Sequence, residues 1–472
     1  MRQTPLALLL LTLATGAAAA EHGEITIYRS DDAALFANDG ASVPAGYALV
    51  RQPRTVNLTA GVQDIHLGGL PLYLDPEALA LEFDGAKASV ISQRLQLAQG
   101  GSALAGNLVG RQVDVLGDQG NVIARGTLLS AGSPLQVRQG DVTVLVHDYA
   151  AVRASGTIDG GSRLDLRVDA QRAGPASAQL SYVTGGLGWR ASYLGTLADG
   201  GACRLDLQSR ASVANRSGSD WHDAQLTLIA GEPRLDKPAA PMVTMAFRGK
   251  AADLPQQSAL ADYRSYRLPA PVDLPDGSIS LLPLYAPRSI ACERTALYET
   301  GGRYQPPQPM IQSPIMTTGP SAVIGTLAFR AFDSLPAGYL RVLARDDRGA
   351  AQVIGESRIE DTPKGGEVKL TLGNVFDLRA RRERTAFHVD RDGRTMDEAF
   401  RLVFTNAGDR ARTVTVREHP SRWRTWILAS SSLRPTVTTA DTLGFAVKVP
   451  AHGSATLDYA VRYTWTADDR PQ

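Results

Sequence analysis

Strict alternation of apolar and polar residues is the feature that most limits how this 472-residue chain can fold. In the last long run, every second residue is large and apolar: Leu457, Tyr459, Val461, Tyr463 and Trp465. A period of two residues is typical of a β-strand that buries one face and exposes the other. Shorter runs of the same kind recur between turns rich in Gly, Pro and Asn. The sequence therefore predicts an all-β protein with few helices.

Short connections between these runs predict antiparallel strands. Residues 450–453 are expected to turn a strand that ends at Val449 back onto the strand at 457–465. Residues 406–409 are expected to close a second hairpin between the apolar runs on either side. Closely spaced antiparallel strands are typical of an immunoglobulin-like β-sandwich. We expect such an antiparallel β-sandwich as the C-terminal domain, preceded by smaller β domains.

Turn-rich segments divide the rest of the chain. Residues 21–100 are expected to form an N-terminal β domain, residues 101–175 a barrel-like set of hairpins, and residues 176–472 the sandwich. The sandwich is predicted to hold an insertion at residues 233–320, which contains 14 of the 27 prolines. Because proline donates no backbone hydrogen bond, this insertion is not expected to supply a continuous central strand. We expect a partly ordered connection across the sandwich, mobile after Tyr304.

The first twenty residues have the features of a secretory signal peptide. Arg2 supplies a positive charge, residues 6–13 form a short apolar core, and residues 18–20 are three alanines. The apolar core is too short for a retained membrane span. We expect cleavage after Ala20 and a periplasmic protein without a transmembrane span.

Charge and cysteine content limit the classes of partner. The formal net charge is +1, so no overall field attracts nucleic acid, and we expect no nucleic-acid partner. The two cysteines, Cys203 and Cys292, either form a disulfide in the oxidising compartment or remain separate buried thiols. Their sequence positions leave both alternatives open, because a bridge requires Cα atoms within about 7 Å. Histidines and cysteines do not occur at ligand spacing, so no metal site is expected.

Several segments together resemble a known family. They are residues 180–193, 214–218, 226–231, 335–338, 354–356, 362–365 and 459–465, with residues 70–76 added near the N-terminus. These segments resemble a bacterial domain of unknown function, carried by exported proteins such as those called mucoidy inhibitor A. The resemblance covers residues 176–466 and implies a β-rich exported protein without assigned catalytic residues. Relatives often place a long helical hairpin between two β domains, where this chain has a Gly-rich β segment.

Four arginines on one predicted strand are candidate binding residues: Arg379, Arg381, Arg382 and Arg384. Guanidinium groups of this kind bind phosphate or carboxylate groups of envelope polymers. The alternative is a solvated hairpin on which nearby acidic residues balance the charge. Arg379 and Arg381 would point to one face of the strand, and Arg382 and Arg384 to the other, so no single face carries all four.

Aromatic residues give a second set of candidates. Trp423 and Trp426 lie among arginines, which indicates an exposed edge or loop where they can stack on a ligand ring. By contrast, Trp189 and Tyr193 share one face of a predicted strand. We interpret this second pair as sandwich core, because large aromatic residues mainly pack in cores.

No nucleophile elbow, phosphate-binding loop or paired-histidine metal helix occurs in the sequence. The sequence therefore predicts an exported, non-catalytic protein that acts in the cell envelope by binding or scaffolding, without a cofactor. Its expected partner is an envelope polymer or another envelope protein. One alternative is a hydrolase of envelope polysaccharide with a carboxylate pair assembled across the sandwich. Another is an assembly subunit with an exposed apolar patch or a free sheet edge.

Overall fold

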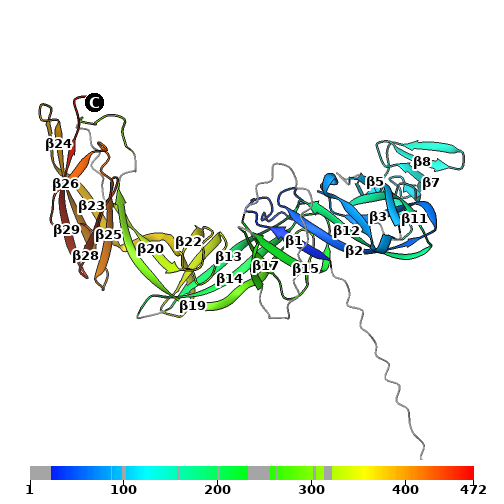
Figure 1. The fold of residues 1–472 in the computed structure, drawn as a ribbon, viewed down its shortest axis with the longest axis horizontal. Helices are drawn as coiled ribbons and strands as arrows, with labels where there is room; N and C mark the ends of the chain where they lie inside the picture. Colours follow the sequence, from blue (N-terminus) through cyan, green and yellow to red (C-terminus); the bar gives the residue numbers. More distant parts are fainter. Residues whose placement is uncertain are drawn as a thin grey trace, which may run out of the picture. The chain divides into compact units, whose positions relative to one another are not determined.

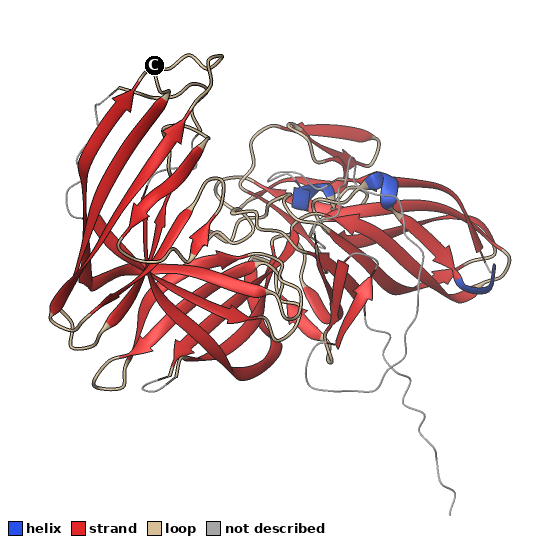
Figure 2. Cartoon of the chain, turned by 60° about the vertical axis from the view of Figure 1, so that its left-hand side comes forward, coloured by secondary structure: helices blue, strands red, loops and turns tan. Residues whose placement is uncertain are grey.

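A computed structural model describes residues 23–86, 88–97, 103–156, 160–198, 202–231, 256–260, 263–300, 305–312 and 321–472. Strands make up almost all of the regular structure, and the protein is all-β, as predicted (Figures 1 and 2). Within these residues the helices are one short α-helix and two 3-10 turns: α1 (Ala103–Gly106), η1 (Pro76–Ala78) and η2 (Asp84–Ala86). The predicted signal peptide, residues 1–20, lies outside the described residues. Within the described part of the chain, no helix has the length and apolar character that a membrane crossing requires.

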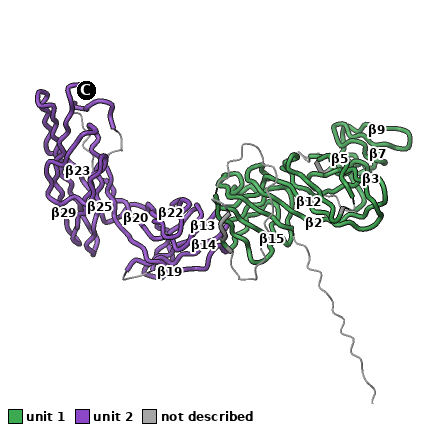
Figure 3. Tube along the Cα trace, viewed as in Figure 1, with its two compact units in different colours: residues 1–189, 212–282 green, residues 190–211, 283–472 purple. Residues whose placement is uncertain are grey.

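The chain divides into two compact units (Figure 3). The first unit comprises residues 1–189 and 212–282, and the second comprises residues 190–211 and 283–472. The boundary falls within three long strands: β13 (Leu187–Leu197), β14 (Arg204–Asn215) and β19 (Ser278–Thr300). These three strands therefore contribute residues to both units.

The described part of the first unit contains three sheets. The largest has the strand order β16-β17-β15-β1-β2-β12-β4, with β18 also paired to β15. Its strands are β1 (Glu24–Tyr28), β2 (Ala48–Leu58), β4 (Ala80–Phe83), β12 (Gly174–Thr184), β15 (Trp221–Ala230), β16 (Gln256–Leu260), β17 (Tyr263–Arg267) and β18 (Val272–Leu274). A second sheet has the order β3-β11-β5, from β3 (Gly61–Leu70), β5 (Ala88–Gln96) and β11 (Ser162–Ala170).

Sheet pairing crosses the domain boundaries that we expected. Strand β1 pairs in parallel with β15, and β2 pairs antiparallel with β12 over eleven residue pairs. Strands from residues 21–100 therefore share a sheet with strands that follow residue 173. The physical reason is that a strand takes the partner that buries its apolar face, regardless of how far apart the two lie in sequence.

The third sheet of the first unit corrects the barrel-like prediction for residues 101–175. Its order is β10-β6-β7-β8-β9, which among the described residues is open rather than closed. The strands are β6 (Gln112–Leu116), β7 (Val122–Ser130), β8 (Leu135–Gln139), β9 (Val142–Val146) and β10 (Ala151–Ala154). One face covers a small apolar core around Val115, Leu128 and Val137. Five short strands bury that core without the extra pairing that closure requires.

The Gly185-Gly186 bend between β12 and β13 shows why glycine is needed there. Gly186 has φ of +79°, which favours glycine. A Cβ on Gly186 would lie 2.4 Å from the Cα of Ser217, and one on Gly185 would lie 2.3 Å from the carbonyl oxygen of Pro44. Only glycine therefore allows the backbone of the neighbouring segments to approach this bend so closely.

The second unit contains the longest sheet, which runs from β22 through β13, β14 and β19 to β26. Its remaining strands are β20 (Ser321–Arg330), β21 (Gly338–Arg345), β22 (Ala351–Ile359), β23 (Glu367–Asp390), β24 (Thr395–Asn406), β25 (Arg412–Glu418), β26 (Trp426–Ser431), β27 (Val437–Thr438), β28 (Leu443–Val449) and β29 (Gly453–Thr464). Near the C-terminus this sheet folds into two layers, β23-β24-β29-β26 and β19-β25-β28-β27 (Figure 1). We call these two layers the C-terminal sandwich.

The core of the C-terminal sandwich confirms the predicted alternation. Leu457, Tyr459, Val461 and Tyr463 on β29 are buried, together with Phe445 on β28 in the facing layer. Polar residues of the opposite parity on β29 face away from the core. The sandwich predicted from period-two patterning is therefore present.

Both hairpins predicted in this region are wrong. Strand β28 pairs with β25 and β27, whereas β29 pairs with β24 and β26. The four residues 450–453 therefore connect the two layers of the sandwich, and residues 406–409 lie in another connection between these layers, from β24 to β25. A short turn permits either arrangement, because in both cases the alternating apolar residues face the same core.

The Pro-rich segment is more regular than we expected. Residues 256–274 supply strands β16 to β18, and β19 is a strand of 23 residues. Pro283 and Pro287 of β19 precede its pairing with β20, which begins at Cys292, so this pairing needs no proline N–H. Residues 305–312 were expected to be mobile, but Met310 and Ile311 donate backbone hydrogen bonds to the sandwich and the C-terminus. Residues 232–255, 301–304 and 313–320 lie outside the described residues.

Candidate functional site

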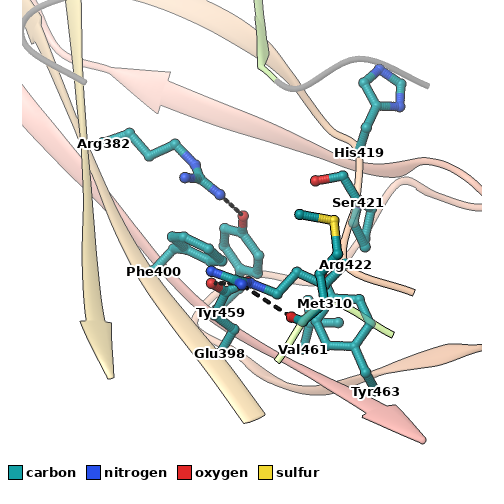
Figure 4. Close-up of a pocket in the computed structure, with 11 residues that line it drawn as sticks. Met310, Arg382, Glu398, Phe400, His419, Ser421, Arg422, Tyr459, Val461 and Tyr463 are labelled. Carbon is teal, nitrogen blue, oxygen red and sulfur yellow. Dashed lines mark hydrogen bonds and ion pairs between the residues drawn. The ribbon is translucent and has the colours of Figure 1, made fainter. Parts of the chain in front are cut away.

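A pocket of about 210 Å³ lies in the C-terminal sandwich (Figure 4). Its walls come from β23, β24 and β29, from residues 419–422 after β25, and from Met310. Ligand pockets for drug-sized molecules commonly measure about 300 to 1,000 Å³. The pocket therefore has room for a small ligand rather than for a large one.

Strand register explains why charged and aromatic side chains meet here. On β24 and β29, Phe400 lies opposite Tyr459, and Glu398 lies opposite Val461. All four have the parity of the buried face, so Glu398 points into the sandwich beside apolar neighbours. On β23, Arg382 continues the inward parity of two buried residues earlier in the same strand.

Arg382 belongs to a first buried polar network with Glu418 and Tyr459. Its Nε and Nη2 atoms each lie 3.1 Å from Oε2 of Glu418, and the Tyr459 hydroxyl donates a 2.6 Å hydrogen bond to the same oxygen. Arg382 also lies over the Phe400 ring, 3.6 Å from its centroid. Glu418 is 2% exposed, and this burial raises the pKa of its carboxyl. Its second oxygen, Oε1, is buried without a hydrogen-bond partner among the described residues.

Glu398 is the centre of a second buried network. Its Oε1 accepts a 2.8 Å hydrogen bond from Nε of Arg422 and a 3.4 Å hydrogen bond from Nη1 of Arg384. The side chains of Glu398 and Arg422 are only 3% and 8% exposed. Arg422 also donates from Nη1 to the carbonyl oxygens of Met310 and Gln312, at 3.1 and 2.8 Å. The segment around Met310 is therefore fixed against the pocket by the same guanidinium group that holds Glu398.

His419 adds a further polar contact at the pocket wall. Its Nδ1 lies 2.9 Å from the Asp441 carbonyl oxygen, and its Nε2 lies 2.9 Å from a Glu299 carboxylate oxygen. A carbonyl oxygen and a carboxylate both accept hydrogen bonds. These two contacts hold the imidazole in place at the pocket wall.

The two networks leave an excess of hydrogen-bond donors around the pocket. Three guanidinium groups, from Arg382, Arg384 and Arg422, face two carboxylates, from Glu398 and Glu418. Among the described residues, Nη1 of Arg382 and Nη2 of Arg422 have no hydrogen-bond partner. The pocket is therefore suited to a group that accepts hydrogen bonds and carries negative charge.

The structure places the four candidate arginines on both faces of β23. Arg382 and Arg384 point inward and bind Glu418 and Glu398, whereas Arg381 is exposed. Arg379 is also exposed, and it donates to the carbonyl oxygens of Phe376 and Leu378 near its own position. The predicted split by parity is observed, and the inward pair is balanced by buried carboxylates rather than by nearby surface residues. That these arginines bind a ligand stays a prediction.

The predicted exposure of Trp423 is wrong. Trp423 is 2% exposed and belongs to the sandwich core, while Arg424 lies over its ring at 4.5 Å. Arg422 points inward because it forms an ion pair with the buried Glu398. An arginine beside the tryptophan therefore does not indicate a surface loop. Trp426 is half-buried, and its indole N–H donates a 2.9 Å hydrogen bond to the Ala440 carbonyl oxygen. Neither ring lines the pocket.

The other sequence candidates lie outside the pocket. Cys203 and Cys292 form a disulfide, with Cα atoms 5.1 Å apart. Trp189 and Tyr193 are buried, as predicted, and donate hydrogen bonds to the carbonyl oxygens of Ile229 and Pro336. Among the described residues, no group of three or more His, Cys, Asp or Glu side chains is placed to hold a metal ion.

Sequence reasoning missed Glu398, Glu418 and Arg422. One signal was available for Glu398, because it has the same parity as Phe400 and the other apolar residues of β24. A charged residue at an inward position predicts a buried partner. No local pattern identifies that partner, because Arg422 lies on a connection rather than on a neighbouring strand.

The fold and the pocket define an all-β protein whose C-terminal sandwich encloses a polar, arginine-lined cavity. A family model described as a domain of unknown function, DUF4139, matches residues 178–467. The match covers more than half of the chain and every residue that lines the pocket. The chain therefore belongs to the DUF4139 family. In a comparison with curated proteins, none matches the sequence.

Proposed function

We propose that this protein is exported and acts in the cell envelope by binding, without catalysis of its own. The proposed binding site is the pocket of the C-terminal sandwich. One observation carries this proposal: Arg382 and Arg422 line the pocket, and each keeps a terminal nitrogen without a hydrogen-bond partner among the described residues. Such donors are available to a ligand that accepts hydrogen bonds.

Three features support export. The first twenty residues have the charge, apolar core and small terminal residues of a signal peptide with cleavage after Ala20. The Cys203–Cys292 disulfide fits an oxidising compartment, such as the bacterial periplasm. The resemblance to mucoidy inhibitor A proteins points to the same location. The partner that we propose is an envelope polymer or another envelope protein.

The experiment that tests the binding function blocks the pocket without removing any charge. Ser421 lines the pocket, and Ser421→Phe would fill part of its volume (Figure 4). Thr425→Phe places the same ring at an exposed position on the same connection and is the matched control. Purified wild type and both variants are crosslinked to isolated envelope fractions, and the captured material is compared. We expect Ser421→Phe alone to lose its specific capture; equal capture by all three proteins would refute the pocket as binding site.

The hydrolase alternative is less well supported by the contacts around the pocket. Glu398 is bound by Arg422, and Glu418 is bound by Arg382 and Tyr459. A glycosidase needs one carboxyl group that donates a proton to the sugar and a second that acts at the opposite face. Release of soluble sugar from envelope polysaccharide by wild type, and its loss in Glu398→Gln, would replace the binding proposal with this alternative.

A scaffolding contribution is favoured by a separate observation on the first unit. Edge strand β9 contains no charged residue, and it pairs only with β8 among the described strands. Leu145, the fourth of its five residues, is 54% exposed. Uncharged edge strands are templates for pairing with another chain. If β9 mediates assembly, Leu145→Lys lowers the molar mass measured by light scattering during gel filtration; an unchanged mass would exclude β9 from assembly.

A further inference from the structure

We propose that the pocket recognises the C-terminal residue of a peptide, by its α-carboxylate, its backbone N–H and an apolar side chain. This inference rests on the proposed binding function and adds the chemical class of the ligand. It is argued from the two guanidinium groups that line the pocket, from its unpartnered polar atoms and from its apolar wall.

The guanidinium groups at the pocket wall favour a negatively charged ligand group. Arg382 and Arg422 line the pocket, and each keeps a terminal nitrogen without a hydrogen-bond partner among the described residues. Because Arg422 and its partner Glu398 are almost fully buried, solvent screens their charges poorly. One carboxylate on the ligand would accept charge-assisted hydrogen bonds from Arg382 and Arg422.

The unpartnered polar atoms match a carboxylate with a neighbouring N–H donor. Nη1 of Arg382 and Nη2 of Arg422 are donors, and the Ser421 hydroxyl, which also lines the pocket, has no hydrogen-bond partner among the described residues. Glu398 uses Oε1 for both of its arginines, so Oε2 accepts no hydrogen bond from the described residues. A C-terminal residue carries two acceptor oxygens next to one amide N–H. The amide N–H would donate to Glu398 while the carboxylate binds the arginines.

The remaining wall of the pocket is apolar. Met310, Phe400 and Val461 line it, and Pro420 adds a further apolar surface. The cavity of about 210 Å³ has room for one amino-acid residue with a side chain of moderate size. An acidic sugar also carries one carboxylate, but its several hydroxyl groups would lie against this apolar wall without partners. These features favour a peptide terminus over an acidic sugar.

The test titrates the purified full chain with four small probes, using saturation-transfer NMR and calorimetry. N-acetylleucine carries the carboxylate, the amide N–H and an apolar side chain. N-acetylleucinamide lacks the negative charge, free leucine replaces the amide with an ammonium group, and glucuronate replaces the peptide unit with a sugar. We expect N-acetylleucine to bind at least about tenfold more tightly than N-acetylleucinamide, because a charge-assisted contact is lost in the amide.

The other probes distinguish the sources of the carboxylate. Tighter binding of N-acetylleucine than of free leucine supports a peptide terminus, whereas the reverse order means a free amino acid and overturns the peptide assignment. Stronger binding of glucuronate overturns the inference in favour of an acidic sugar. Equal binding of N-acetylleucine and N-acetylleucinamide overturns the role of the carboxylate.

Pocket variants place the binding in this cavity. Ser421→Phe should abolish N-acetylleucine binding, while Thr425→Phe should retain it. Arg382→Gln is a second variant that keeps a polar side chain and removes one donor group, and it should weaken binding at least about tenfold. Circular dichroism checks that each variant is folded, and binding that persists in both pocket variants would refute the assignment.

Failure of this inference can be told apart from failure of the proposed function. If envelope capture depends on Ser421 but N-acetylleucine neither binds nor competes, the binding function stands and the ligand class is wrong. If N-acetylleucine binds in the pocket but wild type captures nothing from the envelope, the ligand class stands and the proposed location of the function is wrong.

Discussion

Replacing Glu398 by glutamine tests whether the buried polar networks are as tightly coupled as their geometry indicates. Glu398→Gln preserves the size of the side chain but removes the negative charge that binds Arg422 and Arg384. The nearest guanidinium nitrogen lies 2.8 Å away, and the Glu398 side chain is 3% exposed. The variant therefore leaves two poorly solvated positive charges without their counterion.

The expected loss of stability follows from that burial. Breaking a buried ion pair by removing one partner costs about 3 to 5 kcal/mol. For a folded unit of about 200 residues, each kcal/mol lowers the melting temperature by about 2 to 4 °C, which gives a loss of about 6 to 20 °C. The matched control is Asp458→Asn, which breaks the Arg401–Asp458 pair on the outer face of the same two strands. That pair has the same 2.8 Å separation but side chains 53% and 46% exposed, so we expect a melting temperature close to wild type.

Calorimetry of the full chain measures both variants, because the second unit contains both pairs and either change should affect the same transition. Tryptophan fluorescence during urea unfolding provides a second readout, since three of the five tryptophans, Trp423, Trp426 and Trp465, lie in the same sandwich. If Glu398→Gln melts within a few degrees of Asp458→Asn, burial does not strengthen this ion pair, and the reasoning is wrong.

Three further predictions concern the core, the disulfide and pH. Val461→Asp should unfold the sandwich, because it buries a charge without a partner, whereas Ile427→Asp on the exposed face of β26 should stay folded by circular dichroism. Reduction of the Cys203–Cys292 disulfide, which spans 89 positions, should lower the melting temperature, with about 4 to 5 kcal/mol as upper limit from loop entropy; equal melting with and without reductant would contradict this. The raised pKa of Glu418 means that the folded protein binds this proton more tightly than the unfolded chain. Urea unfolding should therefore show wild type losing stability relative to Glu418→Gln as the pH rises above about 4.5, and the opposite trend would indicate a lowered pKa.

The burial of each strand face could be predicted from the sequence because it is a local property. Tyr459 and Val461 were assigned to the buried face from the alternation of neighbouring residues alone, and both are buried. In each case the information lies within a few residues of the position concerned.

The pairing of strands could not be predicted in the same way. The sequence at 450–453 predicts a hairpin turn, yet β28 and β29 lie in different layers. Strand β28 pairs with β25 and β27, and β29 pairs with β24 and β26. Alternation of apolar and polar residues indicates that a strand has an apolar face, but it does not identify the neighbouring strand. For the same reason, the first expected domain boundary did not foresee that β1 would pair with β15.

The sequence predicted the arginines of the candidate site but not their carboxylate partners. The parity of Arg382 and Arg384 separated them from Arg381, but the sequence did not show which face of β23 was buried. Their partners became visible only in the structure, because Glu418 ends β25 in the other layer, 36 positions from Arg382. A functional site whose members come from both layers requires the strand pairing, which is the part that local patterns do not supply.

The position of the charged networks is itself an argument for a role in binding. Glu398 occupies an inward position between the apolar residues Met396 and Phe400, and Arg382 follows the buried Leu378 and Ala380 on the inward face of β23. Replacing buried ion pairs by well-packed apolar residues is often neutral or stabilising, so stability alone gives little reason for charges at such positions. The networks also hold two donor-bearing guanidinium groups rigidly at the wall of one cavity, and rigid placement of donors lowers the cost of binding a ligand. Ligand binding therefore accounts for both the burial of these charges and the donors that they leave unpaired, whereas a purely structural role accounts only for the ion pairs.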